Sequence, residues 1–278
     1  MRAVTFSEAS LPTLSSDGSK IAYLSENKLY TLDLSESPLG LLNRESKLVS
    51  TTSLPPPNLG GGGRQAGGGI SSLEWSPDNK QILLFSTPSA YLADLTKQEV
   101  QPVLDLKALR KEWSNTKDIR LSRNTELLPQ QIRNILASSA AELVWSPKEN
   151  KVLYTATASA VIPENLIPQL PGSNSQPQER QLRVGKKYVY DLEEDRNFNI
   201  QCLMSNIQWF SDSNHIICVQ NKKIVIMEYD GTNPTTVYTG PMESDFVAAY
   251  PSAKQLLILT NLTGNSTIPP NLYAVSLR

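Results

Sequence analysis

Residues 73–95 read LEWSPDNKQILLFSTPSAYLADL, and this stretch decides the fold. A Trp-Ser-Pro-Asp phrase begins at Trp75, and a Tyr-x-x-Asp-Leu phrase follows 16 residues later at Tyr91. The Pro-Asp-Asn sequence after Ser76 has the chemistry of a tight turn. The unbroken apolar run Ile82–Phe85 is typical of a strand that is buried on both faces. The stretch therefore predicts short antiparallel strands that are joined by tight turns.

Four other parts of the chain repeat this pair of phrases, two of them with insertions between the phrases. The paired positions are Leu14 with Tyr30, Trp145 with Tyr188, Trp209 with Val225, and Ala249 with Tyr273. Each repeat has room for four short strands, and strand-rich units that recur in this way predict a β-propeller. The predicted repeats cover about residues 11–50, 70–104, 142–202, 206–239 and 245–278.

We therefore predict an all-β protein, a β-propeller of four-stranded blades that forms one domain over residues 1–278. Five blades are expected, and a sixth, degenerate blade around Trp113 within residues 96–142 is the alternative. The last repeat ends after its third strand. Residues 2–7 are expected to supply the fourth, which would close the ring and remove an exposed sheet edge.

The repeated phrases resemble the TolB-like propeller repeats, which also occur in prolyl-oligopeptidase-type propellers. The resemblance covers nearly the whole chain and implies an envelope scaffold with a protein or peptide partner. A narrower resemblance, to the propeller region of bacterial PEGA-domain surface proteins, rests on residues 151–158, 170–175 and 187–192. We recognise no PEGA domain in the sequence, so no role of that domain is carried over.

The composition argues against several classes of partner. The 26 basic and 27 acidic residues give a net charge of −1, so no overall field attracts nucleic acid. No apolar run approaches the ~20 residues that span a bilayer. We expect a monomer of the bacterial cell envelope or the extracellular space, with any anchor or signal outside this chain. The two cysteines, Cys202 and Cys218, fall in different predicted blades and are interpreted as small buried apolar residues.

Four insertions suggest where function resides: residues 50–70, 105–140, 156–186 and 260–270. The first two fall between predicted blades and the others between second and third strands, so propeller topology places all four on the same face. Connections longer than ~12–15 residues are usually functional or disordered. We therefore predict a non-enzymatic scaffold that binds a protein or peptide on this face.

The insertions differ in character. Residues 55–69 are Gly-rich but lack the Gly-Lys-Ser/Thr ending of a phosphate loop, which favours a flexible linker. Residues 105–140 are expected to hold one short helix that caps the channel, or alternatively binds a partner; its apolar stripe is Leu128, Ile132, Ile135 and Leu136. Residues 156–186 are Pro-rich and predict an extended, partly mobile loop, with peptide or glycan binding as the alternative. Replacing residues 160–183 by a short Gly-Ser loop is expected to leave folding intact.

The sequence offers little for catalysis or metal binding. His215 is the chain's one histidine and occupies an ordinary hairpin position, without a nucleophile-elbow sequence. Two cysteines and one histidine show no metal-ligand spacing. The alternating set Asp191, Glu193, Asp195 and Asn197 resembles the start of a calcium loop but lacks its Gly and final Glu, so it is interpreted as a solvated acidic rim. The repeated aspartates are interpreted as turn residues: Asp17, Asp78 and Asp212.

The predicted binding residues come from the second and third insertions: Trp113, Arg120, Arg123, Arg180, Arg183 and Lys186. No catalytic residue, metal or cofactor is predicted. The alternative is a carbohydrate-binding or hydrolytic propeller with its ligand in the central channel. Its candidates are Trp113, Asp118 and Glu126.

Overall fold

The computed structural model describes residues 1–35, 45–50, 54–55, 69–87, 89–168, 172–202, 207–265 and 267–277. Within these ranges the protein is mostly β, with two helices. The chain divides into two compact units. The first comprises Met1–Lys117 and Gly240–Arg278, and the second comprises Asp118–Thr239. The prediction of one propeller domain stays a prediction.

The described part of the first unit contains three four-stranded antiparallel sheets. One sheet consists of β2 (Ser10–Leu14), β3 (Lys20–Ser25), β4 (Lys28–Asp33) and β5 (Ser46–Leu48). The next consists of β6 (Ile70–Trp75), β7 (Gln81–Ser86), β8 (Ser89–Asp94) and β9 (Glu99–Pro102). The third joins β20 (Val247–Ala249), β21 (Gln255–Thr260) and β22 (Asn271–Ser276) to β1 (Arg2–Ala3).

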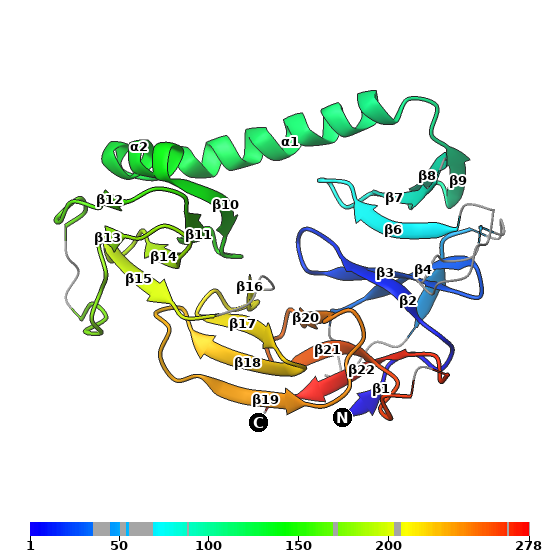
Figure 1. Ribbon diagram of the computed structural model, residues 1–278. Helices are drawn as coiled ribbons and strands as arrows, with labels where there is room; N and C mark the ends of the chain where they lie inside the picture. The colour runs from blue at the N-terminus through cyan, green and yellow to red at the C-terminus, as the bar shows by residue number, and fades with distance from the viewer. Residues whose placement is uncertain are drawn as a thin grey trace. The chain divides into compact units, whose positions relative to one another are not determined.

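Two further four-stranded sheets form the described part of the second unit. The first of them consists of β10 (Ala140–Trp145), β11 (Lys151–Ala156), β14 (Lys187–Asp191) and β15 (Arg196–Ile200). The other consists of β16 (Ile207–Trp209), β17 (His215–Gln220), β18 (Lys223–Glu228) and β19 (Thr235–Thr239). A two-stranded sheet of β12 (Ala160–Val161) and β13 (Gln181–Leu182) lies within the connection between β11 and β14. The helices are α1 (Leu106–Glu126) and α2 (Gln130–Ser139) (Figure 1).

The apolar second strands are buried on both faces, as the sequence predicts. In β3, Ile21 and Tyr23 belong to a cluster shared with the β20–β22 sheet. The alternate residues Ala22 and Leu24 belong to a cluster shared with the β6–β9 sheet. Because successive strand residues point to opposite faces, a strand between two sheets must be apolar throughout. Consecutive four-stranded sheets that stack face to face are the arrangement of propeller blades. The number of blades in a closed ring stays a prediction.

The turn between the first two strands has one conformation in all five sheets. We call the first position of each repeated pair (Leu14, Trp75, Trp145, Trp209 and Ala249) the anchor position. Four residues after each anchor position the backbone adopts a positive φ, at Gly18, Asn79, Glu149, Ser213 and Ala253. The predicted turn role of the aspartates is confirmed. Ser76 Oγ donates a hydrogen bond of 2.7 Å to Asp78 Oδ1, and the equivalent bond from Ser15 to Asp17 is also 2.7 Å.

The start of the chain completes the last sheet. β1 pairs antiparallel with β22, with Arg2 opposite Ala274 (Figure 1). Beyond the strand, the Val4 amide donates to the Leu272 carbonyl at 2.8 Å. The predicted fourth strand is thus confirmed, but it is shorter than residues 2–7, and Phe6 is 79% exposed.

The prediction of one short helix is wrong, because residues 105–140 form two. α2 contains three of the four predicted stripe residues, whereas Leu128 lies before its start; Ile132 and Leu136 pack on the β10–β15 sheet. α1 has 21 residues and was missed. It is mostly polar and presents no continuous apolar face, so its sequence lacks the helical periodicity. Because Trp113 lies on α1, a degenerate sixth blade around this residue is also wrong.

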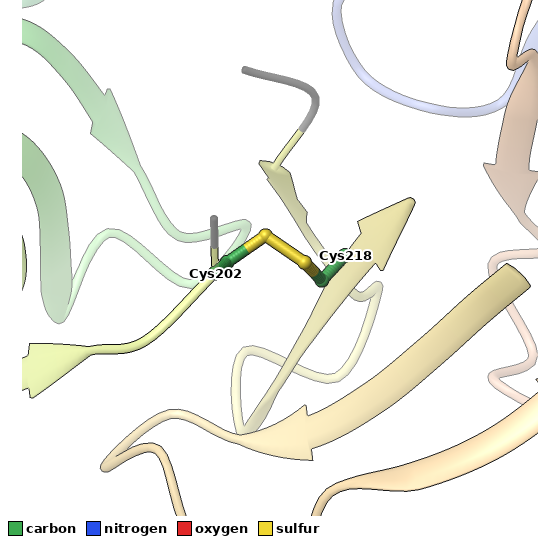
Figure 2. Close-up of a disulfide and its surroundings, with 2 residues drawn as sticks. All are labelled: Cys202 and Cys218. Atoms are coloured by element: carbon green, nitrogen blue, oxygen red, sulfur yellow. A yellow bond between two sulfur atoms is a disulfide. The ribbon is translucent and has the colours of Figure 1, made fainter. Parts of the chain in front are cut away.

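The two cysteines are not separate buried thiols, because they form a disulfide (Figure 2). Cys202 follows β15 and Cys218 lies within β17, with their Cα atoms 6.2 Å apart. The bond joins the two four-stranded sheets of the second unit. The two residues lie in different predicted repeats, and no local sequence pattern indicates that stacking of those repeats brings them together.

Candidate binding surface

The connection between β11 and β14, residues 157–186, is called the β11–β14 insertion below. Its described residues are packed against the protein through β12 and β13. Ile162 and Leu182 are 1% and 0% exposed, and they belong to the same core cluster as Ile132 of α2. Two residues of the predicted loop thus belong to the core, and a Gly-Ser replacement of residues 160–183, which would remove both, is expected to damage the fold.

A buried ion pair holds the insertion to the turn between β14 and β15. Arg180 Nη2 lies 3.2 Å from Asp195 Oδ1, and the two side chains are 11% and 3% exposed. The guanidinium also donates to the backbone carbonyls of Pro163 and Asp195. Asp195 accepts hydrogen bonds of 2.9 Å from the Tyr190 hydroxyl and 2.8 Å from the Leu166 amide. The buried carboxylate is therefore matched by one charge and several donors, as burial of an ion requires.

The insertion also covers the outer edge of its own sheet. The Glu179 amide donates to the Asn197 carbonyl of β15 at 2.8 Å, and Asn197 Nδ2 donates back to the Glu179 carbonyl at 2.7 Å. Asn199 Nδ2 donates to Glu179 Oε2 at 2.8 Å. These bonds use groups of an edge strand that are otherwise open to pairing with another chain. The insertion therefore protects the exposed edge of β15 from pairing with another chain.

A third contact reaches the neighbouring sheet of the second unit. Asn174 Nδ2 donates to Asp230 Oδ2 at 2.8 Å and to the Tyr229 hydroxyl at 3.2 Å. Burial opposes ionisation of Asp230, but the hydrogen bonds from Thr232 and Asn174 outweigh it and lower the pKa of this carboxyl. One insertion is thus anchored to both four-stranded sheets of the unit.

The interpretation of residues 191–197 as a solvated acidic rim holds for Glu193, which is exposed, and is wrong for the other three. Asp191 and Asp195 are 1% and 3% exposed, and Asn197 is fully buried. Lys151 Nζ lies 3.4 Å from Asp191 Oδ2, with both side chains almost inaccessible. The turn between β14 and β15 is where the sequence places it, but contacts with the insertion bury Asp195 within it. Burial likewise raises the pKa of the neighbouring hydroxyls of Tyr154 and Tyr190.

Many residues of the insertion are exposed, and two apolar and two basic side chains on and beside its short strands are among them. Val161 and Val184 are 60% and 64% exposed, and Arg183 and Lys186 are exposed as well. We call these four residues the insertion surface. Arg183 Nε lies 3.2 Å from Glu179 Oε1, but the arginine side chain is 68% exposed, so solvent screens this pair. Val161 lies in β12 and the other three residues follow β13, so the set comprises two apolar side chains and two cations from neighbouring segments of the insertion.

The structure does not bring all six predicted binding residues together. Arg180, Arg183 and Lys186 share the insertion, but the guanidinium of Arg180 is directed inward. On α1, Arg120 Nη2 lies 3.3 Å from Glu149 Oε1 of the second unit, and Arg123 is exposed. Trp113 belongs to the first unit and is 5% exposed, packed with Leu83 of β7. Binding by these residues stays a prediction.

The structure also places His215, the one histidine of the chain. His215 Nδ1 lies 2.6 Å from Asp212 Oδ2, within the turn that precedes β17. Among the described residues, no group of three or more His, Cys, Asp and Glu is placed to hold a metal ion. Neither described helix is long and apolar enough to cross a membrane.

The structure describes most of insertion 260–270 but little of insertion 50–70. Most of the Gly-rich stretch 55–69, and with it most of insertion 50–70, lies outside the described residues. Residues 261–265 of insertion 260–270 are folded around Asn261, whose Nδ2 donates to the Asn265 carbonyl at 2.8 Å and whose Oδ1 accepts the Gly264 amide at 2.8 Å.

Several residues that build the site carried no usable sequence signal. Asn174 and Glu179 belong to a polar, Pro-rich stretch whose composition predicts mobility. Their partners are 18 to 56 residues away in sequence. The acidic alternation at residues 191–197 was a signal, because it includes Asp195, which is the partner of Arg180.

Comparison with known proteins gives fold similarity and no family. No protein-family model matches the sequence, and no curated protein matches it. A protein described as TolB from Agrobacterium tumefaciens is 13% identical over 98% of this chain and 81% of its own, with a TM-score of 0.30. An oligogalacturonate lyase from Vibrio parahaemolyticus is 9% identical over 99% and 80%, with a TM-score of 0.36. A chain of the mitotic checkpoint complex is 10% identical over 100% and 94%, with a TM-score of 0.44.

These neighbours include TolB-like and other β-propeller proteins at low identity, in agreement with the broader resemblance found in the sequence. At these TM-scores they carry no argument about what the chain binds or whether it acts on a substrate. The narrower resemblance to PEGA-domain surface proteins stays a prediction.

Proposed function

We propose that this protein is a non-enzymatic β-propeller scaffold of five blades that binds a protein or peptide partner. The proposal is supported most by one observation, which is the anchored β11–β14 insertion. A connection of this length without function is expected to be mobile. Here buried contacts to two sheets hold it in place, while Val161, Arg183, Val184 and Lys186 stay exposed.

The chemistry of the insertion surface suggests the class of partner. Two exposed cations favour carboxylates, and the two exposed valines favour apolar side chains beside them. An extended segment that alternates acidic and apolar residues satisfies both requirements. Because buried contacts already order the insertion, the insertion loses little conformational entropy when such a segment binds.

The experiment must change the exposed side chains of the insertion surface and leave intact the buried contacts that anchor the insertion. Deleting the insertion would remove Ile162 and Leu182 from the core cluster that they share with Ile132, and would take Arg180 away from Asp195. The Arg183→Glu/Lys186→Glu double variant instead reverses the two exposed charges. The matched control is Lys80→Glu/Lys97→Glu, in which both lysines are 67% exposed and lie on turns of the β6–β9 sheet.

The assay is selection of peptides from a random display library on the immobilised full chain. We expect enrichment of acidic sequences with interspersed apolar residues. Their affinity should fall at least tenfold for Arg183→Glu/Lys186→Glu and stay within twofold for the control. Equal loss in both variants, or selected peptides without acidic residues, would contradict the proposal.

The structure offers no support for a sugar or substrate site made of the alternative candidates. The Trp113 ring is buried against the β6–β9 sheet. Asp118 and Glu126 lie eight residues apart on α1, which separates them by about 12 Å along the helix axis. Because these three side chains do not converge, we do not advance this function.

A further inference from the structure

Both cysteines of the chain are used in one disulfide. The sequence contains two, Cys202 and Cys218, and both belong to the described residues. Cys202 continues the outer strand β15 of one sheet, and Cys218 occupies the middle of β17 in the next sheet. The bond therefore connects elements that are neighbours through packing, not through strand pairing (Figure 2).

The half-cystines are buried in an apolar environment. Cys202 is 8% exposed and Cys218 is 2% exposed, within a core cluster that includes Leu153, Phe198 and Met227. A thiol–disulfide exchange partner must reach one of the sulfur atoms, and burial blocks that approach. This position favours a permanent structural bond over a switch that opens and closes in the native protein.

The disulfide adds a covalent bond to a joint between sheets that hydrogen bonds also make. In the same unit, Trp209 Nε1 donates to the Val144 carbonyl at 2.9 Å, and the Lys148 amide donates to Ser213 Oγ at 2.9 Å. These hydrogen bonds connect the first strands and the turns of the two sheets. The disulfide connects β15 to β17, and thereby the edge on which the β11–β14 insertion rests.

We infer that this protein is oxidised in the cell and matures in an oxidising compartment outside the cytoplasm. Cytosolic thiols are kept reduced, and structural disulfides persist mainly in exported proteins. Formation of the bond removes two electrons and two protons from the cysteine thiols. The electrons pass to a disulfide-donor protein of the exporting compartment, which becomes its dithiol form. The inference does not depend on the proposed binding function.

The direct test counts thiols in source cells. Cells are quenched with acid, and the denatured protein is treated with a polyethylene-glycol maleimide before or after reduction, in cytoplasmic and exported fractions. We expect no adduct before reduction, two after it, and recovery from the exported fraction. Two adducts before reduction would overturn the inference. An oxidised protein confined to the cytoplasm would overturn its assignment to a compartment.

A second measurement tests the structural role of the bond. The melting temperature of the purified full chain is compared with and without reductant, alongside the Cys202→Ser/Cys218→Ser variant. Reduction should lower the melting temperature of the wild type to that of the variant and leave the variant unchanged. If the variant does not fold, the fully reduced wild type makes the same comparison. An unchanged melting temperature after complete reduction would overturn the structural role.

Discussion

Two arginines three residues apart in the β11–β14 insertion have opposite environments. The guanidinium of Arg180 is buried against Asp195, whereas the side chain of Arg183 is 68% exposed beside Glu179. Both are arginines of one short segment, and both were predicted to bind a partner. The register of β13 decides between them, because it directs Arg180 toward the turn between β14 and β15.

Removing Arg180 should therefore cost far more stability than removing Arg183. Arg180→Ala leaves Asp195 buried without a counter-charge, and loss of one member of a buried pair costs about 3–5 kcal/mol. Arg183→Ala breaks an exposed pair and should cost no more than about 1 kcal/mol. Urea unfolding of the full chain measures both values, and similar losses in the two variants would contradict this assignment.

Asp78, one of the turn aspartates, makes the stability of the fold depend on pH in the acid range. The Ser76 hydroxyl, the Lys80 amide and the Lys80 charge together lower the pKa of Asp78 below its usual value, against a smaller opposing effect of burial. Because the folded pKa lies below the unfolded one, this stabilisation is complete above about pH 4 and is lost as pH falls through the folded pKa.

Ser76→Ala should raise the pKa of Asp78 and shift the acid unfolding of the protein to higher pH. Carboxyl titration by NMR gives the pKa, and melting temperatures between about pH 7 and pH 2 give the stability. Asp78→Asn serves as the control, since it removes the titrating group and Ser76→Ala should then add no further pH dependence. A pKa unchanged by Ser76→Ala would show that the serine is not its cause.

At the scale of elements, the strands and turns follow from local sequence, and α1 does not. Apolar runs seven residues after each anchor became β3, β7, β11, β17 and β21, because any strand stacked between two sheets needs two apolar faces. The stripe at Ile132 and Leu136 predicted α2. Residues 114–123 of α1 are all exposed, so nothing in their pattern marks a buried face.

Attachment of α1 to the first unit should depend mainly on Trp113. This residue packs with Leu83 and Ala90, and the Arg110 guanidinium lies 4.5 Å from the centre of the Phe85 ring. Trp113→Ala should destabilise the chain by about 3–5 kcal/mol and speed proteolysis within α1. Ile119→Ala, at a position 71% exposed, should change stability by no more than about 0.5 kcal/mol. Equal effects would show that α1 is not held by the tryptophan.

At the scale of the molecule, the sequence predicted the individual sheets better than the contacts between distant segments. The sequence pattern of each repeat predicts its strands, and the five four-stranded sheets agree with this prediction. The completion of the last sheet by the start of the chain was predicted as well. The pairs Arg180–Asp195, Asn174–Asp230 and Cys202–Cys218 join segments 15 to 56 residues apart. No local pattern specifies such contacts, since they exist only after the sheets stack.

The disulfide should contribute measurably to the stability of the second unit. Its closed loop has a sequence separation of 16 residues, for which chain-entropy arguments give about 3 kcal/mol. Cys202→Ala/Cys218→Ala should lose about this amount in urea unfolding under non-reducing conditions. A loss below about 0.5 kcal/mol would show that packing around Met227 and Phe198 holds the joint without the bond.

The central claim is that the insertion surface binds a partner. A photo-crosslinking amino acid placed at Val184 in source cells tests it most directly, with Leu104, which is 99% exposed in the first unit, as the control position. The account predicts one discrete adduct from Val184, joined to an acidic segment of its partner and absent in the Arg183→Glu/Lys186→Glu background. Equal adducts from both positions, or an adduct indifferent to those charges, would contradict it.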